Sequence, residues 1–383
     1  MKCSVSVHPT NSADWERVRA GDWSRGPIKP DHVVWDRALR IVDLADELGF
    51  DNLWTTEHHI TPYGMIPNPL TFLAHAAGRT KRLGMGTSVI VLPWWHSPLR
   101  AAEEIALVDT FLGPDRDLTV GLGRGIAASE YAVFGVDRSE ARGRFREALD
   151  IIRLALLEER FSYDGQYFQI PETTMRPRPR DPRRIVDTMV GAFTSGDSRE
   201  MMAELGLGMM FTGGKAPEGM REDIISFNSA RLAAGREPVK PIVVQFTLCT
   251  DSRTQAETGE ASFNRLSEEI SWHYKLGDAS QFEGVKGYES YLKQAKEGGG
   301  KTRSAFGRVD KLVLSGNPGE LTARLEPPLK SLGAQEVQFH FLYADIPLDL
   351  AENSMRLFAK EVMPMIKELE APLTDELAGM VDA

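Results

Sequence analysis

The stretch FDNLWTTEHHITPYG, residues 50–64, starts with the apolar pattern of a buried strand and ends with the polar pattern of a loop. Where the apolar run stops, Glu57, His58 and His59 follow one another, which puts two of the chain's eight histidines side by side. In proteins built from repeated strand–helix units, reactive side chains lie at the carboxyl ends of the strands. The stretch therefore forms either a solvated turn or the floor of an active site. The strand and helix pattern on both sides of it distinguishes the two.

The alternation of strand and helix extends along the chain on both sides of this stretch. Trp35, Leu39 and Val42 fall at helical spacing before it, and Gly49 stands where that helix should end. Strand patterns, mostly separated by helical ones, occupy residues 2–7, 52–56, 83–93, 117–123, 185–191, 208–214, 241–250 and 336–342. This rhythm predicts an α/β fold, a (β/α)8 TIM barrel with insertions, in one domain spanning residues 1–383. A doubly wound sheet is the alternative, but no convincing dinucleotide fingerprint supports it.

Three segments interrupt the rhythm. The pattern of residues 161–170 predicts a hairpin around Asp164–Gly165. The Pro- and Arg-rich residues 174–184 form either an extended connector or a phosphate-binding segment, and their composition favours the connector. Residues 284–310 contain three consecutive glycines and several charges, which predicts a long mobile insertion.

Composition excludes several classes of protein. Apolar residues make up 42% of the 383 residues, which is enough for a sizeable core. The net charge of −10 argues against a nucleic-acid-binding surface. Two cysteines provide no disulfide framework, no apolar run is long enough to span a bilayer, and MKCSVSVHPT is too short and polar for a signal peptide. A cytoplasmic protein without membrane contact is expected.

Polar side chains follow the predicted strands so regularly that they are expected to meet at one rim of the barrel. The sequence GLGRG, residues 121–125, lacks the dinucleotide spacing because Ile126 takes the place of the third glycine. It forms either a tight turn with a surface arginine or a place where the backbone approaches a ligand beside Arg124. The sequence TSGDSRE, residues 194–200, is either an ordinary helix cap or a phosphate site at a helix start. With Arg124 on the same rim, a phosphate-bearing ligand is favoured.

The paired histidines are not expected to share a metal ion, because neighbours on extended backbone point to opposite sides. A site from His58, His96 and His340 is the remaining metal candidate, and it is disfavoured because the chain has no H-x-H or H-E-x-x-H spacing. A neutral histidine at a barrel mouth is better suited to moving a proton or holding an anionic intermediate. His273 is compatible with either a core or a site position.

Several motifs taken together resemble the bacterial luciferase-like flavin-dependent monooxygenases. They are GFDNLWTTEHHITPYG, GMGTSVIVLPWWHSPLRAAEEIALVD, VGLGRG, VFGVDRSEAR, KGYESYLKQ and SMRLFAKEVMPMIKE. The resemblance implies a barrel that binds reduced FMN at its carboxyl-terminal rim, with the flavin supplied by a separate flavin reductase. It also implies that O2 is the co-substrate, that a flavin peroxide oxidises the organic substrate, and that the protein is a homodimer.

The resemblance also assigns residues to the site. It implies that His58 is the catalytic histidine with His59 beside it, and that the insertion at 284–310 closes over the site. It places FMN against Glu57, Ser88, Val89, Arg124, Arg142, Ala192, Phe193, Thr194, Ser195 and Ser198. Within this set, the bond between Ser88 and Val89 matches a non-prolyl cis peptide. The phosphate positions are Arg124, Arg142, Ser195 and Ser198.

Three positions depart from the luciferase pattern. Gly123 replaces a reactive cysteine, Thr194 replaces an acidic residue, and the bulky pair Trp94–Trp95 follows the third strand. Light emission from a long-chain aldehyde is therefore not expected. A two-component monooxygenase that hydroxylates a small apolar substrate, or inserts oxygen into it in Baeyer–Villiger fashion, is favoured. The alternatives are an F420-dependent oxidoreductase, a non-catalytic luciferase-like subunit and, least favoured, a metal-dependent hydrolase.

Overall fold

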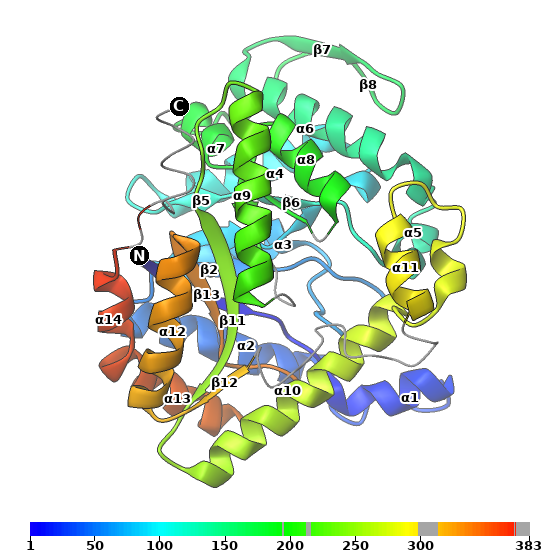
Figure 1. The fold of residues 1–383 in the computed structure, drawn as a ribbon. Helices are drawn as coiled ribbons and strands as arrows, with labels where there is room; N and C mark the ends of the chain where they lie inside the picture. The colour runs from blue at the N-terminus through cyan, green and yellow to red at the C-terminus, as the bar shows by residue number, and fades with distance from the viewer. Residues whose placement is uncertain (194, 212–215, 298–312, 371, 373–383) are drawn as a thin grey trace.

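The computed structural model describes residues 1–193, 195–211, 216–297, 313–370 and 372, and a barrel of parallel strands forms its centre (Figure 1). In chain order, the strands of this barrel are β1 (Lys2–Val7), β2 (Asn52–Thr55), β3 (Gly84–Thr87) continued by β4 (Ile90–Val91), β5 (Leu118–Thr119) continued by β6 (Gly121–Gly123), β9 (Val190–Ala192), β10 (Gly208–Met210), β11 (Pro241–Cys249) and β13 (Glu336–His340). The hydrogen-bonded path runs β4-β6-β9-β10-β11-β13-β1-β2-β3-β5. Because β3 leads into β4 and β5 into β6, the two ends of the path adjoin and the sheet closes. The predicted (β/α)8 barrel is confirmed.

The amino end of the barrel is filled by a buried polar cluster around Glu336. Its Oε1 accepts hydrogen bonds from Ser4 Oγ at 2.6 Å, Asn52 Nδ2 at 2.8 Å and Trp54 Nε1 at 2.6 Å. Burial raises the pKa of Glu336, although these hydrogen bonds oppose the shift. This end is therefore closed by hydrogen-bonded side chains, which leaves the opposite end for a ligand.

Helices cover the outside of the barrel (Figure 1). They pack as the amphipathic patterns predict, with their apolar faces buried against the strands. The main ones are α2 (Asp31–Leu48), α3 (Pro69–Arg79), α4 (Pro98–Leu112), α6 (Ala141–Leu157), α8 (Gly196–Glu204), α9 (Pro217–Ala233), α10 (Arg253–Tyr274), α12 (Pro318–Leu332) and α13 (Leu348–Glu361). Shorter helices are α1 (Trp15–Ala20), α5 (Ala128–Val133), α7 (Pro182–Asp187), α11 (Glu289–Glu297) and α14 (Met363–Glu368).

The predicted hairpin is present at the periphery of the molecule (Figure 1). It consists of the antiparallel strands β7 (Phe161–Asp164) and β8 (Gln169–Thr173). A further strand, β12 (Val313–Gly316), pairs in parallel with β11 and was not predicted.

Part of the predicted strand at residues 185–191 is helical instead. Pro182 occupies the first turn of α7, and the Asp181 side chain accepts a hydrogen bond from the Arg184 backbone N–H at 3.0 Å, so this cap starts a helix before the strand can begin. The predicted insertion at 284–310 is described only as far as residue 297, and that part includes α11. Its remainder, 298–310, lies outside the described residues.

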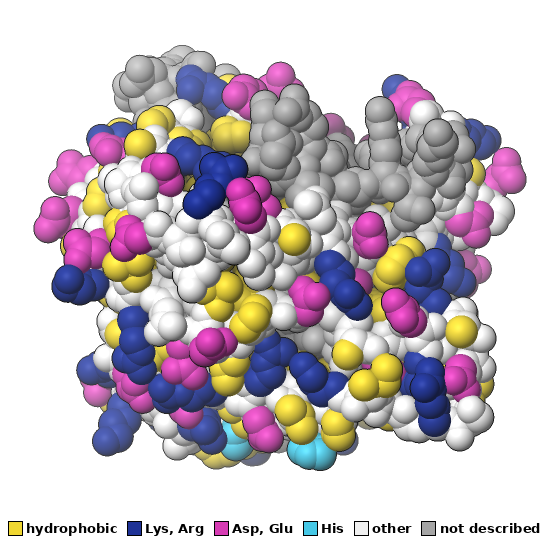
Figure 2. All heavy atoms as spheres, turned by 90° about the horizontal axis from the view of Figure 1, so that it is seen from below, with side chains coloured by type: hydrophobic (Ala, Val, Ile, Leu, Met, Phe, Trp, Pro, Cys, Tyr) yellow, Lys and Arg dark blue, Asp and Glu magenta, His cyan; other side chains and the backbone are white. Residues whose placement is uncertain are grey.

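Two observations concern membrane-spanning helices and the distribution of charge on the surface. Among the described helices, none has both the length and the apolar character that crossing a bilayer requires. Figure 2 shows one face, on which basic and acidic side chains are interspersed rather than separated into patches.

Candidate active site

A cavity of about 430 Å³ lies at the carboxyl ends of the barrel strands. Its apolar lining includes Val89, Val91, Trp94, Phe193, Phe211, Val244 and Phe246. Its polar lining includes His8, Glu57, His58, Ser88, Arg124, Glu130, Ser198 and His340. A cavity that combines apolar walls with converging polar groups is the usual form of a small-molecule site.

The buried carboxylate of Glu57 organises the wall that follows β4. Its Oε2 accepts a hydrogen bond from the Val91 backbone N–H at 2.9 Å, and its Oε1 accepts one from Trp94 Nε1 at 2.5 Å. Trp95 Nε1 lies 3.2 Å from both oxygens, and His59 Nε2 lies 3.2 Å from Oε1. The strand predicted over residues 83–93 ends at Val91, where this carboxylate binds the backbone. Glu57 thus lines the cavity, and both of its carboxylate oxygens accept hydrogen bonds from other residues of the chain.

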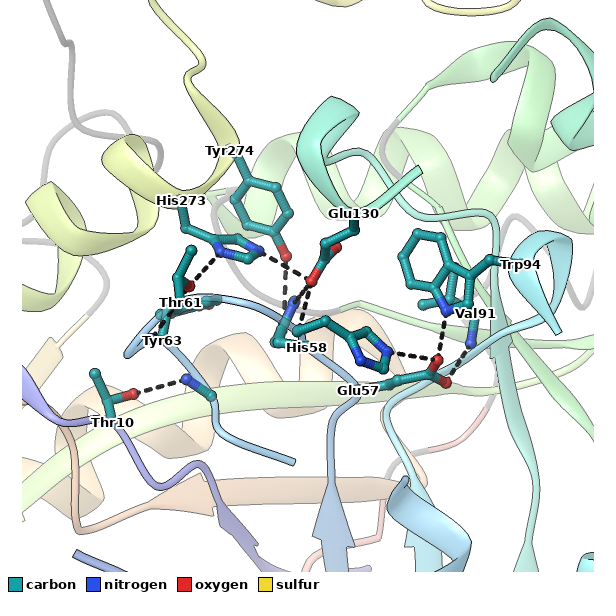
Figure 3. Close-up of polar contacts among 12 residues, drawn as sticks. Thr10, Glu57, His58, Thr61, Tyr63, Val91, Trp94, Glu130, His273 and Tyr274 are labelled. Carbon is teal, nitrogen blue, oxygen red and sulfur yellow. Dashed lines mark hydrogen bonds and ion pairs between the residues drawn. The ribbon is translucent and has the colours of Figure 1, made fainter. Parts of the chain in front are cut away.

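His58 is held between two other polar side chains (Figure 3). Its Nδ1 lies 3.6 Å from Glu130 Oε1, and its Nε2 lies 3.4 Å from the Tyr274 hydroxyl. Burial lowers the pKa of His58, although the Glu130 carboxylate opposes this shift. The imidazole is therefore neutral at neutral pH, and in this form it can accept a proton.

Glu130 and His273 belong to the site but were not assigned to it from the sequence. Glu130 Oε1 lies 3.4 Å from His273 Nε2 and accepts a hydrogen bond from the His59 backbone N–H at 2.7 Å. His273 Nδ1 lies 2.8 Å from Thr61 Oγ1. Burial alone would raise the pKa of Glu130, but the imidazoles of His273 and His58 that face its carboxylate hold that pKa well below its usual value. The ionised carboxylate therefore lies between two imidazoles, as Figure 3 shows.

Two further histidines close the floor of the cavity. His8 packs edge-on against Tyr63, with ring centroids 4.4 Å apart, and its centroid lies 5.7 Å from that of His58. His340 stacks on Phe246 at 4.4 Å. Burial lowers the pKa of His340 to about 3, and burial together with the neighbouring histidines lowers that of His8 well below its usual value. Both rings are therefore neutral near pH 7, so the floor carries no net charge from them.

A group of arginines and serines forms a cradle beside the cavity. Arg124 donates from Nε and Nη2 to Ser198 Oγ at 3.0 and 2.6 Å, and Ser198 Oγ lies 2.9 Å from Ser195 Oγ at the start of α8. Arg142 reaches the same place, where its Nη2 lies 2.5 Å from Asp197 Oδ2. We call the set Arg124, Arg138, Arg142, Ser195 and Ser198 the arginine–serine cradle.

The segment before α11 packs onto this cradle. The buried Tyr288 ring lies under two guanidinium groups, with Arg138 at 4.3 Å and Arg124 at 5.0 Å from its centroid. Arg124 Nη2 also donates to the Gly287 carbonyl at 3.4 Å. Within the described part of the chain, several buried nitrogens of these side chains have no hydrogen-bond partner: Arg124 Nη1, Arg138 Nε and Nη2, and Arg142 Nε. Buried N–H groups of cations without partners indicate a place for an anion.

The structure brings most of the predicted residues to the cavity. Those in its lining are Glu57, His58, Ser88, Val89, Arg124, Ala192, Phe193 and Ser198. The bond between Ser88 and Val89 is cis, as the resemblance implied. Arg142 and Ser195 lie in the cradle behind this lining. Thr194 lies outside the described residues.

His59 is not part of the cavity lining. Its ring packs edge-on against Phe134 at 4.7 Å and Trp94 at 5.8 Å, and its Nε2 is bonded to Glu57. This agrees with the expectation that neighbouring side chains diverge, since His58 lines the cavity while His59 contacts Glu57. This position supports Glu57 and gives His59 no direct access to the cavity.

Comparison with protein families gives one match over most of the chain. The model described as luciferase-like monooxygenase covers residues 17–336. A flavin-dependent trigonelline monooxygenase oxygenase component from Acinetobacter baylyi is 33% identical over 148 residues, which is 38% of this chain and 40% of that protein. The alkanal monooxygenase alpha chain of the Kryptophanaron alfredi symbiont is 24% identical over 345 residues, which is 88% of this chain and 94% of that one. The match to the trigonelline monooxygenase component thus spans well under half of that protein's length.

Solved structures share the fold. The monooxygenase RslO1 from Streptomyces bottropensis superposes with a TM-score of 0.74 at 24% identity, covering 96% of this chain and all of that one. The oxygenating constituent of 3,6-diketocamphane monooxygenase from Pseudomonas putida, a type II Baeyer–Villiger enzyme in complex with FMN, gives 0.69 at 18% identity and covers 97% and 100%. An F420-dependent secondary alcohol dehydrogenase gives 0.67 at 13% identity and covers 94% and 98%. At these identities the likeness establishes the barrel and leaves the choice of cofactor open.

Proposed function

The chain belongs to the luciferase-like monooxygenase family, and we propose that it is the FMN-dependent oxygenase of a two-component system. In this proposal, reduced FMN comes from a separate flavin reductase, and O2 is the co-substrate. A small apolar molecule is then hydroxylated or receives oxygen by Baeyer–Villiger insertion. The observation that carries the proposal is the arginine–serine cradle beside a cavity lined by His58 and by apolar side chains.

The cradle fits the phosphate of FMN. A phosphate monoester carries nearly two negative charges and accepts several hydrogen bonds, and the unpartnered nitrogens of Arg124, Arg138 and Arg142 supply donors for it. Each buried donor left without a partner costs about 1–3 kcal/mol, so the cradle favours an anion of this kind. The Ser195 and Ser198 hydroxyls at the start of α8 add further donors. Reduced flavin, when bound, supplies the electrons that activate O2.

In this proposal, residues of the chain transfer a proton and limit the access of water to the site. His58 is neutral and lies in the cavity lining, so its imidazole can take up and return a proton. Glu130 and Tyr274 fix the orientation of this ring. Val89, Trp94, Phe193, Phe211 and Phe246 form the apolar part of the lining, which suits an apolar substrate and limits access of water on that side.

The competing activity is that of an F420-dependent oxidoreductase, since such an enzyme shares the fold. We would titrate the protein without oxygen, first with reduced FMN and then with F420, and follow tryptophan fluorescence. Reduced FMN should bind, and Arg124→Gln should weaken this binding by about 100-fold, because charge-assisted hydrogen bonds contribute about 1.5–3 kcal/mol each. The control is Arg146→Gln, which changes an exposed arginine of α6 that pairs with Glu204 and should leave binding unchanged.

The second step of the test mixes the complex of protein and reduced FMN with air. An absorbance phase that free reduced FMN does not show, together with O2 consumption, would support an oxygenase. Binding of F420 without binding of FMN would overturn the proposal. Binding of FMN without any change in its reaction with O2 would favour the non-catalytic subunit instead.

Two partners are part of the same proposal. The oxygenase-component name of one relative supports a separate reductase. A homodimer is proposed from the family resemblance, and α4 supplies exposed apolar side chains for such a contact, with Leu107 38% and Phe111 51% exposed. Sedimentation of the wild type and of Phe111→Ser would test it, since the substitution should shift a dimer towards the monomer.

A further inference from the structure

Three side chains from separate parts of the chain converge beside the cavity. Glu130 Oε1 lies 3.6 Å from His58 Nδ1 and 3.4 Å from His273 Nε2 (Figure 3). The ligand atoms of these three residues all lie within 4.8 Å of one another. This set differs from the metal candidate considered from the sequence, because among the described residues the group that gathers is His58, Glu130 and His273, without His96 or His340.

The two imidazole nitrogens that face Glu130 are buried, and each lies at ion-pair distance from its carboxylate without making a hydrogen bond. His58 is 9% exposed and His273 is 2% exposed, and neither His58 Nδ1 nor His273 Nε2 makes a hydrogen bond to any described residue. Buried polar atoms normally make a hydrogen bond, and an ion placed between these two nitrogens and the carboxylate would give all three atoms a common partner.

The second ring nitrogens of the two histidines are held by other groups. Glu130 Oε1, the oxygen that faces both rings, also accepts the His59 N–H at 2.7 Å. His273 Nδ1 lies 2.8 Å from Thr61 Oγ1, and His58 Nε2 lies 3.4 Å from the Tyr274 hydroxyl. In metal sites, the second nitrogen of a ligating histidine is usually bound in this way, which fixes the ring and its tautomer.

We propose that His58, Glu130 and His273 form a binding site for a divalent transition metal, with Zn²⁺ as the best match. Two imidazoles and one carboxylate are a ligand set that Zn²⁺ accepts with one position left open. Ligands about 2.0–2.1 Å from a tetrahedral ion lie about 3.3–3.4 Å apart, close to the measured separations from Glu130 Oε1. The nitrogen ligands disfavour Mg²⁺ and Ca²⁺, which prefer oxygen.

The proposal rests on this geometry and does not depend on the flavin chemistry. If the metal site and the proposed flavin chemistry are both correct, they are linked through His58. A metal on Nδ1 prevents His58 from taking up a second proton, so bound Zn²⁺ would block the proton transfer proposed for His58.

The test is a calorimetric titration of the chelator-treated full chain with Zn²⁺, with Co²⁺ as the spectroscopic probe. The wild type should bind one equivalent with micromolar or tighter affinity and give the visible spectrum of four-coordinate Co²⁺. The variants Glu130→Gln and His273→Ala should bind more than about 100-fold more weakly, because loss of an outer-shell partner alone costs about 10–100-fold. His75→Ala, which removes an exposed histidine of α3, is the control and should bind like the wild type.

A second readout keeps the test informative if one variant folds poorly. Zn²⁺ should raise the melting temperature of the wild type and of His75→Ala, while Glu130→Gln, which keeps the shape of the side chain, should show no shift. The proposal is overturned if the wild type shows no saturable one-to-one binding, or if Glu130→Gln binds Zn²⁺ as tightly as the wild type. In either case Glu130 serves only as an acceptor for protons on the two histidines.

Discussion

Replacing Gly64 with alanine would force a methyl group between two imidazoles of the site. Gly64 has a φ of +53°, in the left-handed region. A Cβ at this position would lie 2.3 Å from His8 Nε2 and 2.8 Å from His58 Cδ2. The rings cannot easily move away, because His8 packs against Tyr63 and His58 is held by Tyr274.

The structure sets the size of the effect. A non-glycine residue in the left-handed region costs about 1–2 kcal/mol. An extra methyl group in a well-packed region costs about 1–3 kcal/mol more. We therefore expect Gly64→Ala to lower the free energy of unfolding by about 2–5 kcal/mol.

The matched control is Gly49→Ala. Gly49 also has a positive φ, +82°, but a Cβ there would have no atom within 4 Å, so only the backbone cost applies. Urea denaturation followed by tryptophan fluorescence would compare the two variants with the wild type. The reasoning requires Gly64→Ala to be the less stable variant by about 1–3 kcal/mol. Equal losses for the two variants would refute it, because the contact with His8 and His58 would then contribute nothing.

Three further predictions concern buried groups. Glu57→Gln should lower the free energy of unfolding by about 2–4 kcal/mol, since at least one buried donor such as Trp94 Nε1 loses its acceptor; urea denaturation and near-ultraviolet circular dichroism would check this. Burial raises the pKa of Glu269 to about 7. The folded state therefore holds a proton that the unfolded state releases, and stability should fall by about 3 kcal/mol as the pH rises from about 4.5 to about 7. Glu269→Gln should remove this slope when melting is measured across that range. Gly123→Cys should destabilise the protein by about 1–3 kcal/mol, because its Cβ would lie 2.4 Å from Val89 Cγ2; the added change Val89→Ala should restore the melting temperature, and no recovery would contradict this account.

The barrel and the position of the site could be predicted because their signals are local. Strand and helix periods appear within short windows, and polar residues at strand ends reach one rim of a parallel barrel. Glu57, His58 and Arg124 were found in this way. The different surroundings of His58 and His59 also agree with the expected divergence of neighbouring side chains.

The rest depends on contacts between distant residues. Glu130 lies in the short helix α5, where an acidic side chain has no local feature that distinguishes it from a solvated one, and its partner His273 is 143 positions away along the chain. The sequence likewise does not show that Arg138 stacks on Tyr288. The start of α7 is a different case, because Pro182 and the Asp181 cap are visible in the sequence but were outweighed by the apolar residues that follow.

The pairing of the first strand with the last has a consequence for synthesis on the ribosome. Val5 pairs with Leu53 on one side and with Phe339 on the other. A nascent chain can form the first contact early, but the second must wait until β13 has emerged. During that interval β1 presents an unpaired edge, which is open to other chains. Folding of the newly made chain should therefore depend on a chaperone, and refolding in vitro should depend on slow dilution.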